Sequence, residues 1–335
     1  MRVLREYLKQ AGPVTEANAW EHVYRCLLWF DDGAGLAHIY DSNHMQKGGN
    51  FHSRAVRFTK TLCSHWNVKT AELSGHLDVL FRGCVEELKR QEAEKPKGEP
   101  STIDAEDMEA EIESELTVNI RKLLEEHGLG ENSTPALADK IEALSRHYFT
   151  IGNKRQNALG EGFEDLLSIL LQRVSNIPEK MVATRTPVSK LPGFLREEPT
   201  EEGGKKPHEP RPDIAIVDDN ITHVITTAKW SIRQDRQTQF QAEYQSFQTK
   251  KRQPTELRYS LITNEFDIAR LRNVFDAIPG GKGGYIFHDV YHISVDLLRQ
   301  AHGAAFSELQ PYVKIGKLKS LSDYLREMRV RYGEE

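Results

Sequence analysis

The chain has 335 residues, of which 38% are hydrophobic and 28% charged, and its formal net charge at pH 7 is -5. This composition is that of a folded protein with a substantial core, and it excludes an intrinsically disordered chain. No apolar run approaches the ~20 residues of a membrane helix, and the first residues lack the apolar stretch of a signal peptide. We therefore expect a cytoplasmic protein.

Helical patterns dominate the first 150 residues. Apolar side chains recur there at spacings of three and four residues, as in Leu77, Leu80, Phe81 and Cys84. Five such patterns occupy residues 19–30, 53–66, 72–91, 108–126 and 135–149. Residues 1–150 are therefore predicted to form an all-α domain.

Residues 151–335 are predicted to contain both helices and strands. The patterns predict, in chain order, a helix at 162–177, strands at 180–186, 212–217 and 222–230, a helix at 236–251, a strand at 259–265, a helix at 267–277, a strand at 284–294 and a terminal helical region. Asp218, Asp219 and Asn220 are strong turn formers between two of the strands. This order predicts an α/β domain with a mixed central sheet flanked by helices.

Charge is unevenly divided along the chain. Residues 1–145 carry 17 Lys and Arg against 25 Asp and Glu, whereas the remainder carries 28 against 25 and leans basic. A modestly basic domain can bind DNA if its cations converge on one face, because phosphate contacts dominate affinity. The overall negative sign therefore does not exclude a nucleic-acid partner.

Two residues with complementary chemistry stand on neighbouring predicted strands. Asp213 follows a proline at the start of the strand at 212–217, and Lys229 lies near the end of the strand at 222–230. A tight turn between these strands would bring the carboxylate and the ammonium together at one edge. Hydrolysis of a phosphodiester needs carboxylates that hold Mg²⁺ and a cation that orients or activates the attacking water. The place for a second acid, two residues before the lysine, is taken by Thr227.

An acid further along the chain can supply the missing carboxylate. Glu243 lies on the helix predicted at 236–251, from which its side chain could reach back to the metal. The segment Arg233-Gln234-Asp235-Arg236 stands between Lys229 and this glutamate. Lysine, Arg-x-Asp-Arg and a displaced glutamate together resemble the type II restriction endonucleases that recognise sequences with a CCGG core. This group belongs to the PD-(D/E)XK nuclease superfamily, and the resemblance covers mainly residues 155–250.

The resemblance implies a PD-(D/E)XK restriction-endonuclease-like fold and a set of active-site residues. Asp213 and Glu243 would bind Mg²⁺, and Lys229 would position the water and stabilise developing charge. An additional metal-binding glutamate lies upstream in this group, commonly in a Phe-Glu pair, and corresponds to Glu164, with Glu161 as the competing choice. The alternative is that both glutamates are solvated residues on an amphipathic helix.

The segment between lysine and glutamate has the chemistry to read G·C pairs. Arginine can donate two hydrogen bonds to guanine and aspartate can accept from cytosine, each contact contributing roughly 1–3 kcal/mol of discrimination. The resemblance implies that Arg233, Asp235 and Arg236 read the CCGG bases in the major groove. The alternative is a salt-bridged helix start, with Asp235 near the positive end of the helix dipole.

The implied function is Mg²⁺-dependent cleavage of double-stranded DNA at a palindrome with a CCGG core, giving 5′-phosphate ends and 5′ overhangs. Cutting both strands of a palindrome implies a homodimer, or a higher oligomer built from dimers. A cognate DNA methyltransferase is expected in the same prokaryotic restriction-modification system, and residues 1–150 would serve dimerisation or DNA contacts. The alternatives are the related CCNGG group and an inactive DNA-binding or interaction protein.

Overall fold

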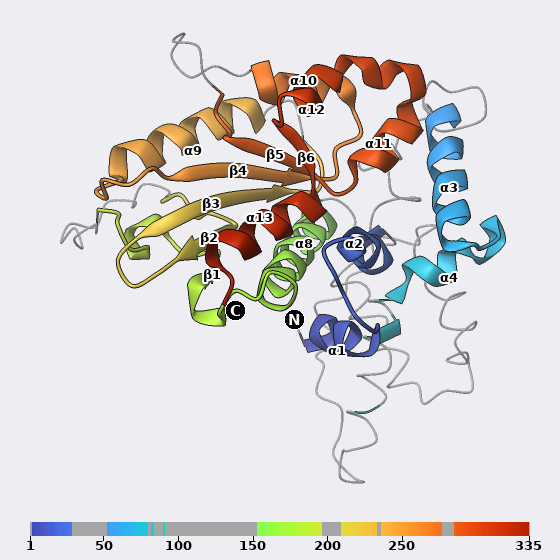
Figure 1. Cartoon of the computed structure of the whole chain (residues 1–335), viewed down its shortest axis with the longest axis horizontal. Helices are drawn as coiled ribbons and strands as arrows, with labels where there is room; N and C mark the ends of the chain where they lie inside the picture. Colours follow the sequence, from blue (N-terminus) through green and yellow to red (C-terminus); the bar gives the residue numbers. More distant parts are fainter. Residues whose placement is uncertain are drawn as a thin grey trace, which may run out of the picture.

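The computed structural model describes residues 2–28, 52–79, 82–83, 90, 153–195, 209–232, 236–276 and 285–334 (Figure 1). Within these ranges no helix is long and apolar enough to cross a membrane. The helices predicted at 108–126 and 135–149 lie outside the described residues.

Every element described before residue 150 is helical. These elements are α1 (Arg2–Gln10), α2 (Ala19–Leu27), α3 (His52–Trp66), the 3-10 turn η4 (Thr70–Glu72) and α4 (Leu73–Leu77). The helices predicted to begin at residues 19 and 53 are confirmed, whereas α1 is a helix that the pattern analysis does not predict. The boundary predicted at residue 150 lies outside the described residues and stays a prediction.

The centre of the fold is a mixed six-stranded sheet, which confirms the predicted α/β class. Its strands, adjacent in numerical order, are β1 (Val182–Thr184), β2 (Ile214–Val217), β3 (Thr222–Lys229), β4 (Arg258–Thr263), β5 (Asp289–His292) and β6 (Leu318–Ser320). The pairs β1–β2 and β2–β3 are antiparallel, and β3 to β6 run parallel. Residues of β2 and β5 are buried throughout, as expected where helices cover both faces of a sheet.

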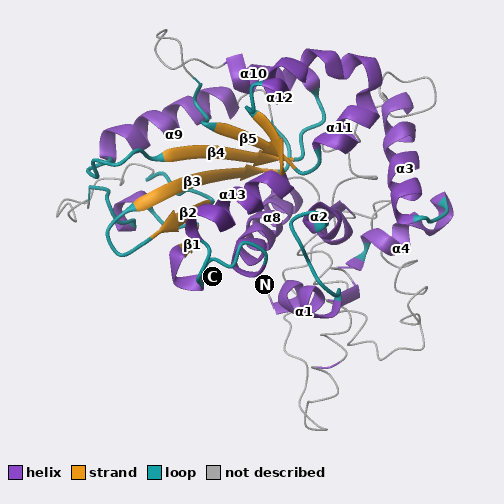
Figure 2. Ribbon diagram, in the orientation of Figure 1, coloured by secondary structure: helices purple, strands orange, loops and turns teal. Residues whose placement is uncertain are grey.

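Helices cover the two faces of the sheet (Figure 2). α8 (Asn153–Arg173) packs against β1 and β3, and α13 (Leu321–Tyr332) packs against β5 and β6. α9 (Arg236–Lys250) lies on the opposite face, where Phe247 contacts Tyr259 of β4 with ring centroids 5.3 Å apart. Neighbouring residues of β3 point to opposite faces, since the hydroxyl of Thr226 contacts Tyr324 of α13 and that of Thr227 contacts Tyr259.

Other short helices complete the fold. They are η6 (Glu179–Met181), η7 (Val188–Lys190), α10 (Ile268–Asp276), α11 (Val295–His302), η9 (Gly303–Glu308) and α12 (Gln310–Lys314). The side chain of Ser294 accepts a hydrogen bond from the backbone N–H of Leu297 at 3.2 Å and so caps the start of α11.

The turn between β2 and β3 forms as its sequence predicts. Asp218 Oδ1 accepts hydrogen bonds from the backbone N–H groups of Asn220 at 3.0 Å and Ile221 at 2.9 Å. This side chain closes the turn because aspartate can bond to backbone groups two and three residues further on. The turn sets the register in which Ile214 pairs with Thr226, so Asp213 lies next to Thr227 and Ala228.

The amino-terminal helices pack onto the α/β unit. α2 packs against α8 and α13, and α3 packs against α11. Tyr24 of α2 donates a buried hydrogen bond of 2.8 Å to Asn264, just beyond β4. Leu4, Tyr24 and Phe58 of these helices belong to the same hydrophobic cluster as the residues of the sheet.

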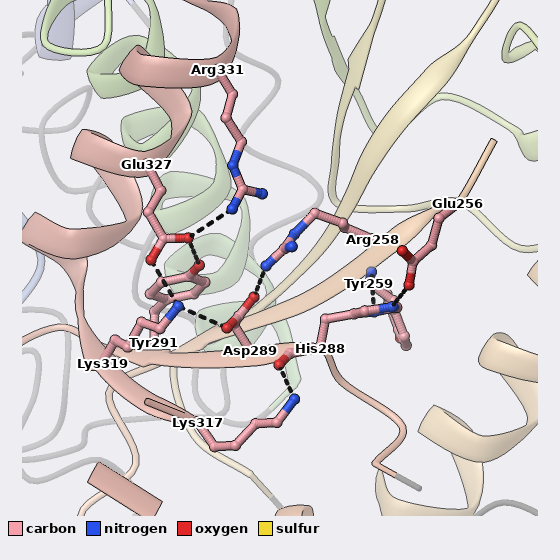
Figure 3. Close-up of polar contacts among 10 residues, drawn as sticks. All are labelled: Glu256, Arg258, Tyr259, His288, Asp289, Tyr291, Lys317, Lys319, Glu327 and Arg331. Atoms are coloured by element: carbon pink, nitrogen blue, oxygen red, sulfur yellow. Dashed lines mark hydrogen bonds and ion pairs between the residues drawn. The ribbon is translucent and has the colours of Figure 1, made fainter. Parts of the chain in front are cut away.

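An ion-pair network lies at the amino ends of β4, β5 and β6 (Figure 3). Asp289 pairs with Arg258 and accepts from Lys319 Nζ at 2.8 Å. Lys319 also donates to Glu327 at 2.7 Å, and the hydroxyl of Tyr291 donates to Glu327 at 3.1 Å. The network ties α13 to three parallel strands at the end of the sheet opposite to Lys229.

Two buried histidines give the fold an acid sensitivity. Burial lowers the pKa of His292 on β5 to about 3. Burial, with the nearby charge of Arg54, lowers that of His302 at the end of α11 to about 4. The unfolded chain binds these protons near pH 6.5, whereas the folded chain binds them only at much lower pH. Each histidine therefore stabilises the fold above pH 6.5 and loses that contribution as the pH falls.

The variant His292→Asn isolates this effect. Asparagine keeps an acceptor for the backbone N–H of Ser294, which His292 Nδ1 accepts at 3.0 Å, but it does not titrate. The difference in unfolding free energy between wild type and variant should shrink by about 1.4 kcal/mol per pH unit below 6.5. Urea unfolding at pH 7, 6 and 5 measures this. The opposite contributions of Glu164 and Glu265, whose pKa values are raised to about 8 and about 7, largely by burial, cancel in the difference. A difference independent of pH would contradict the assignment.

Candidate active site

Asp213 and Lys229 meet at the edge shared by β2 and β3. Lys229 Nζ lies 2.6 Å from Asp213 Oδ2, and the backbone N–H of Ala228 donates to the same oxygen at 2.7 Å. Both side chains are mostly buried, with 14% of Asp213 and 21% of Lys229 exposed. The tight turn and the antiparallel register bring the two groups together, as we expect from the sequence.

Glu164 lies beside this pair, on α8. Its neighbour Phe163 is fully buried and packs edge-on against Trp230, directly after Lys229, with ring centroids 5.4 Å apart. This aromatic contact fixes α8 against the end of β3 and leaves Glu164 with 10% of its side chain exposed. Glu161, the competing choice, is an exposed residue one turn earlier.

The electrostatics of Glu164 identify its neighbours. Burial and the negative charge of Asp213 raise the pKa of Glu164 to about 8, against the opposing effect of the positive charges of Lys229 and Arg185. Two carboxylates that repel one another across a partly buried site favour the uptake of a proton or a cation. A divalent cation between them would keep both ionised.

Arg185 is a residue of the site that the sequence reasoning leaves unassigned. Its guanidinium donates to Glu164 Oε2 at 3.1 Å and to Asp165 Oδ1 at 2.6 Å, and its backbone N–H donates to the carbonyl of Asp213 at 3.1 Å. Its φ of 50° is uncommon for a residue other than glycine. Such strained positions cluster at functional sites. Here the strained residue contacts the side chains of Glu164 and Asp165. In the sequence, only a basic residue directly after a short strand signals this role.

Glu243 is connected to the edge of the sheet through a tyrosine. Its Oε2 accepts from the hydroxyl of Tyr259 at 3.2 Å, and its Oε1 accepts from the amide of Gln239 at 2.7 Å. The same tyrosine hydroxyl lies 3.0 Å from Thr227 Oγ1. Glu243 therefore reaches back from α9 toward the position of the missing acid, with one hydroxyl between its carboxylate and Thr227.

The donor set fits Mg²⁺ with few protein ligands. Magnesium is usually bound by one or two carboxylates together with waters and substrate phosphates. Asp213 and Glu164 supply two carboxylates whose mutual repulsion a cation would relieve. Across the ranges that the structure describes, no group of three or more His, Cys, Asp or Glu side chains is placed to hold an ion. Glu243 is thus not gathered with Asp213 and Glu164 into one group.

The predicted base-reading segment is only partly within the described residues. Arg233 and Asp235 lie outside them, and Arg236 is the first residue of α9. The helix predicted at 236–251 is confirmed as α9, Arg236–Lys250. Glu243 follows on the same helix, so a base-reading role of Arg236 would be coupled to the candidate active site by a rigid element.

The described surface also has a pocket of about 530 Å³ elsewhere. It lies between α3 and the start of α11, and Trp20, Lys60, His65 and Asp296 are among its lining residues. None of the predicted site residues lines it, so it is separate from the carboxylate pair.

Comparisons with known proteins give little further identification. No protein-family model matches the chain, and no curated protein matches it. Among solved structures, a complex of restriction endonuclease PspGI with substrate DNA is similar, with 14% sequence identity and a TM-score of 0.33. The similarity covers 75% of this chain and 76% of that chain.

Proposed function

We propose that the chain is a type II restriction endonuclease of the PD-(D/E)XK fold. The observation that carries the proposal is the 2.6 Å contact between Lys229 and Asp213 beside the partly buried Glu164. Carboxylates and a lysine at one sheet edge are the groups that metal-assisted phosphodiester hydrolysis requires. The spacing of Lys229, the Arg-x-Asp-Arg segment and Glu243 supports a palindrome with a CCGG core as the substrate.

The residues divide the chemistry among them. Asp213 and Glu164 would hold Mg²⁺, and Glu243 would be a third metal-binding acid. The bound ion would supply Lewis-acid activation of the scissile phosphate. The ammonium of Lys229 has three donors, one of which goes to Asp213. Its other donors can orient the attacking water and stabilise charge that develops on the phosphate oxygens. Arg185 donates hydrogen bonds to both Glu164 and Asp165 and so holds the carboxylate of Glu164 in place.

The proposed partners follow from a palindromic substrate. Each strand needs its own catalytic centre, so two copies of the chain would assemble around a two-fold axis. Cleavage before the first cytosine of the core would leave 5′-phosphate ends with 5′ overhangs. A methyltransferase of the same restriction-modification system would protect the DNA of a prokaryotic host without contacting this chain.

Digestion of matched plasmids tests the function. A plasmid with CCGG sites should give discrete fragments in Mg²⁺, while the same plasmid in EDTA and a derivative without CCGG should stay intact. Cleavage of CCNGG sites instead would assign the chain to the related group. An inactive DNA-binding protein, which Thr227 alone would favour, predicts no discrete fragments from any CCGG-containing DNA, and that result would contradict the proposal.

A further inference from the structure

A chain of three side chains connects the sheet edge to the displaced glutamate. Thr227 on β3, Tyr259 on β4 and Glu243 on α9 are joined by contacts of 3.0 Å and 3.2 Å at the tyrosine hydroxyl. Thr227 and Tyr259 are 2% and 1% exposed, so water cannot substitute easily for either partner. Thr227 stands where an ordinary site of this superfamily has its acid. The hydrogen bonds through Tyr259 therefore join that position to Glu243.

The hydrogen bonds in this chain have a defined direction. The hydroxyl of Tyr259 donates to Glu243 Oε2 at 3.2 Å. A phenol has one proton, and the carboxylate of Glu243 can only accept it. Thr227 must therefore donate its own proton to the oxygen of Tyr259. Each hydroxyl has one favourable orientation while Glu243 is ionised.

The ring of Tyr259 is rigidly held. Its centroid lies 4.6 Å from that of Phe287 and 5.3 Å from that of Phe247, and Tyr244 stacks on it at 6.2 Å. Its backbone N–H also donates to the ring of His288 at 3.0 Å (Figure 3). The tyrosine hydroxyl therefore occupies a fixed point, and it restricts a carboxylate at the end of a side chain with three rotatable bonds.

We propose that Tyr259 is a positioning residue that holds the Glu243 carboxylate one hydroxyl away from Thr227, in an orientation for binding a divalent cation. The inference rests on the proposed function, in which Glu243 is a metal-binding acid. The hydroxyl of Tyr259 connects Glu243 to Thr227, the position at which an ordinary site of this superfamily has its acid. Outer partners that orient a metal-binding carboxylate typically change affinity or activity by 10–100-fold when removed.

The fold offers a matched control for this contact. Tyr291 on β5 is also fully buried and donates a 3.1 Å hydrogen bond to a glutamate, Glu327 (Figure 3). That pair lies in the ion-pair network at the opposite end of the sheet. Tyr291→Phe and Tyr259→Phe therefore remove the same kind of hydrogen bond from the same sheet, and only Tyr259→Phe touches Glu243.

Binding of Mn²⁺ to the full chain without DNA, measured by electron paramagnetic resonance, tests the inference. Tyr259→Phe should weaken Mn²⁺ binding by about tenfold, and Tyr291→Phe should leave it unchanged. In a Glu243→Gln background, which itself weakens binding, adding Tyr259→Phe should have little further effect, because the two changes remove one shared interaction. Thr227→Val, which removes the donor to Tyr259 with little change of shape, should weaken binding by a smaller factor.

The outcomes separate this inference from the proposed function. Wild-type affinity in Tyr259→Phe, an equal loss in Tyr291→Phe, or a full tenfold further loss in the Glu243→Gln background would overturn the role of Tyr259. No Mn²⁺ binding by the wild type would overturn it as well. The plasmid digest is independent of these results. If Mn²⁺ binds with the expected pattern but the plasmid stays intact, the proposed nuclease function is rejected and the role of Tyr259 is kept. Urea unfolding of each variant checks that the fold is kept.

Discussion

Asp213→Asn is expected to lower the rate of DNA cleavage by roughly 1,000-fold or more, because metal-assisted stabilisation of the transition state is worth several kcal/mol. The amide has nearly the shape of the carboxylate, and one oxygen can still accept from Ala228 and Lys229, the partners of Asp213 Oδ2. The fold and the binding of CCGG-containing DNA should therefore persist. Single-turnover cleavage and gel-shift measurements on the same duplex separate the two effects.

Asp296→Asn is the control for this variant. Asp296 is an acid on α11 with 76% of its side chain exposed, and it pairs only with a neighbouring arginine on the same helix among the contacts that the structure describes. It should cleave at the wild-type rate. A rate for Asp213→Asn within tenfold of the wild type would remove Asp213 from the active site.

Arg236→Ala is expected to reduce the preference for CCGG over unrelated DNA by roughly 5- to 150-fold, the range that corresponds to a loss of 1–3 kcal/mol at a base contact. Arg236 begins α9, on which Glu243 follows. Competition gel shifts with specific and nonspecific duplexes measure the ratio of the two affinities. The ratio matters because a lost phosphate contact weakens both complexes alike.

Arg252→Ala provides the matched change of charge. Arg252 lies just beyond the other end of α9, and its side chain donates to the backbone carbonyls of Thr249 and Lys251. Its loss should change affinity for both duplexes by a similar factor and leave the ratio unchanged. An unchanged ratio in Arg236→Ala would reject a base-reading role for that residue.

The sheet could be predicted well where strands are long and apolar. β2 and β3 lie within predicted strands, and β4 begins one residue before the strand predicted at 259–265, because these apolar runs are bounded by turn formers and charged residues. β6 is missed, since its three residues Leu318, Lys319 and Ser320 carry no alternating pattern. Its pairing with β5 comes from tertiary packing, which local sequence does not record.

The candidate site could be predicted only in part. Asp213 and Lys229 are brought together by a single tight turn, so their contact follows from local sequence. Tyr259 reaches Thr227 because β4 runs parallel to β3 in one particular register, and Arg185 reaches Glu164 because α8 packs beside β1. Registers and helix packing of this kind depend on the whole core, and no short motif encodes them.

Sequencing the ends of fragments from a genomic digest tests the proposed function most directly. Wild-type protein with Mg²⁺ should give ends that all map to one palindrome with a CCGG core, each with a 5′ overhang that starts at the first cytosine. The Asp213→Asn variant, treated in parallel, should give no such ends. Ends scattered over unrelated sequences, or the same ends from the variant, would contradict a CCGG-specific nuclease centred on Asp213.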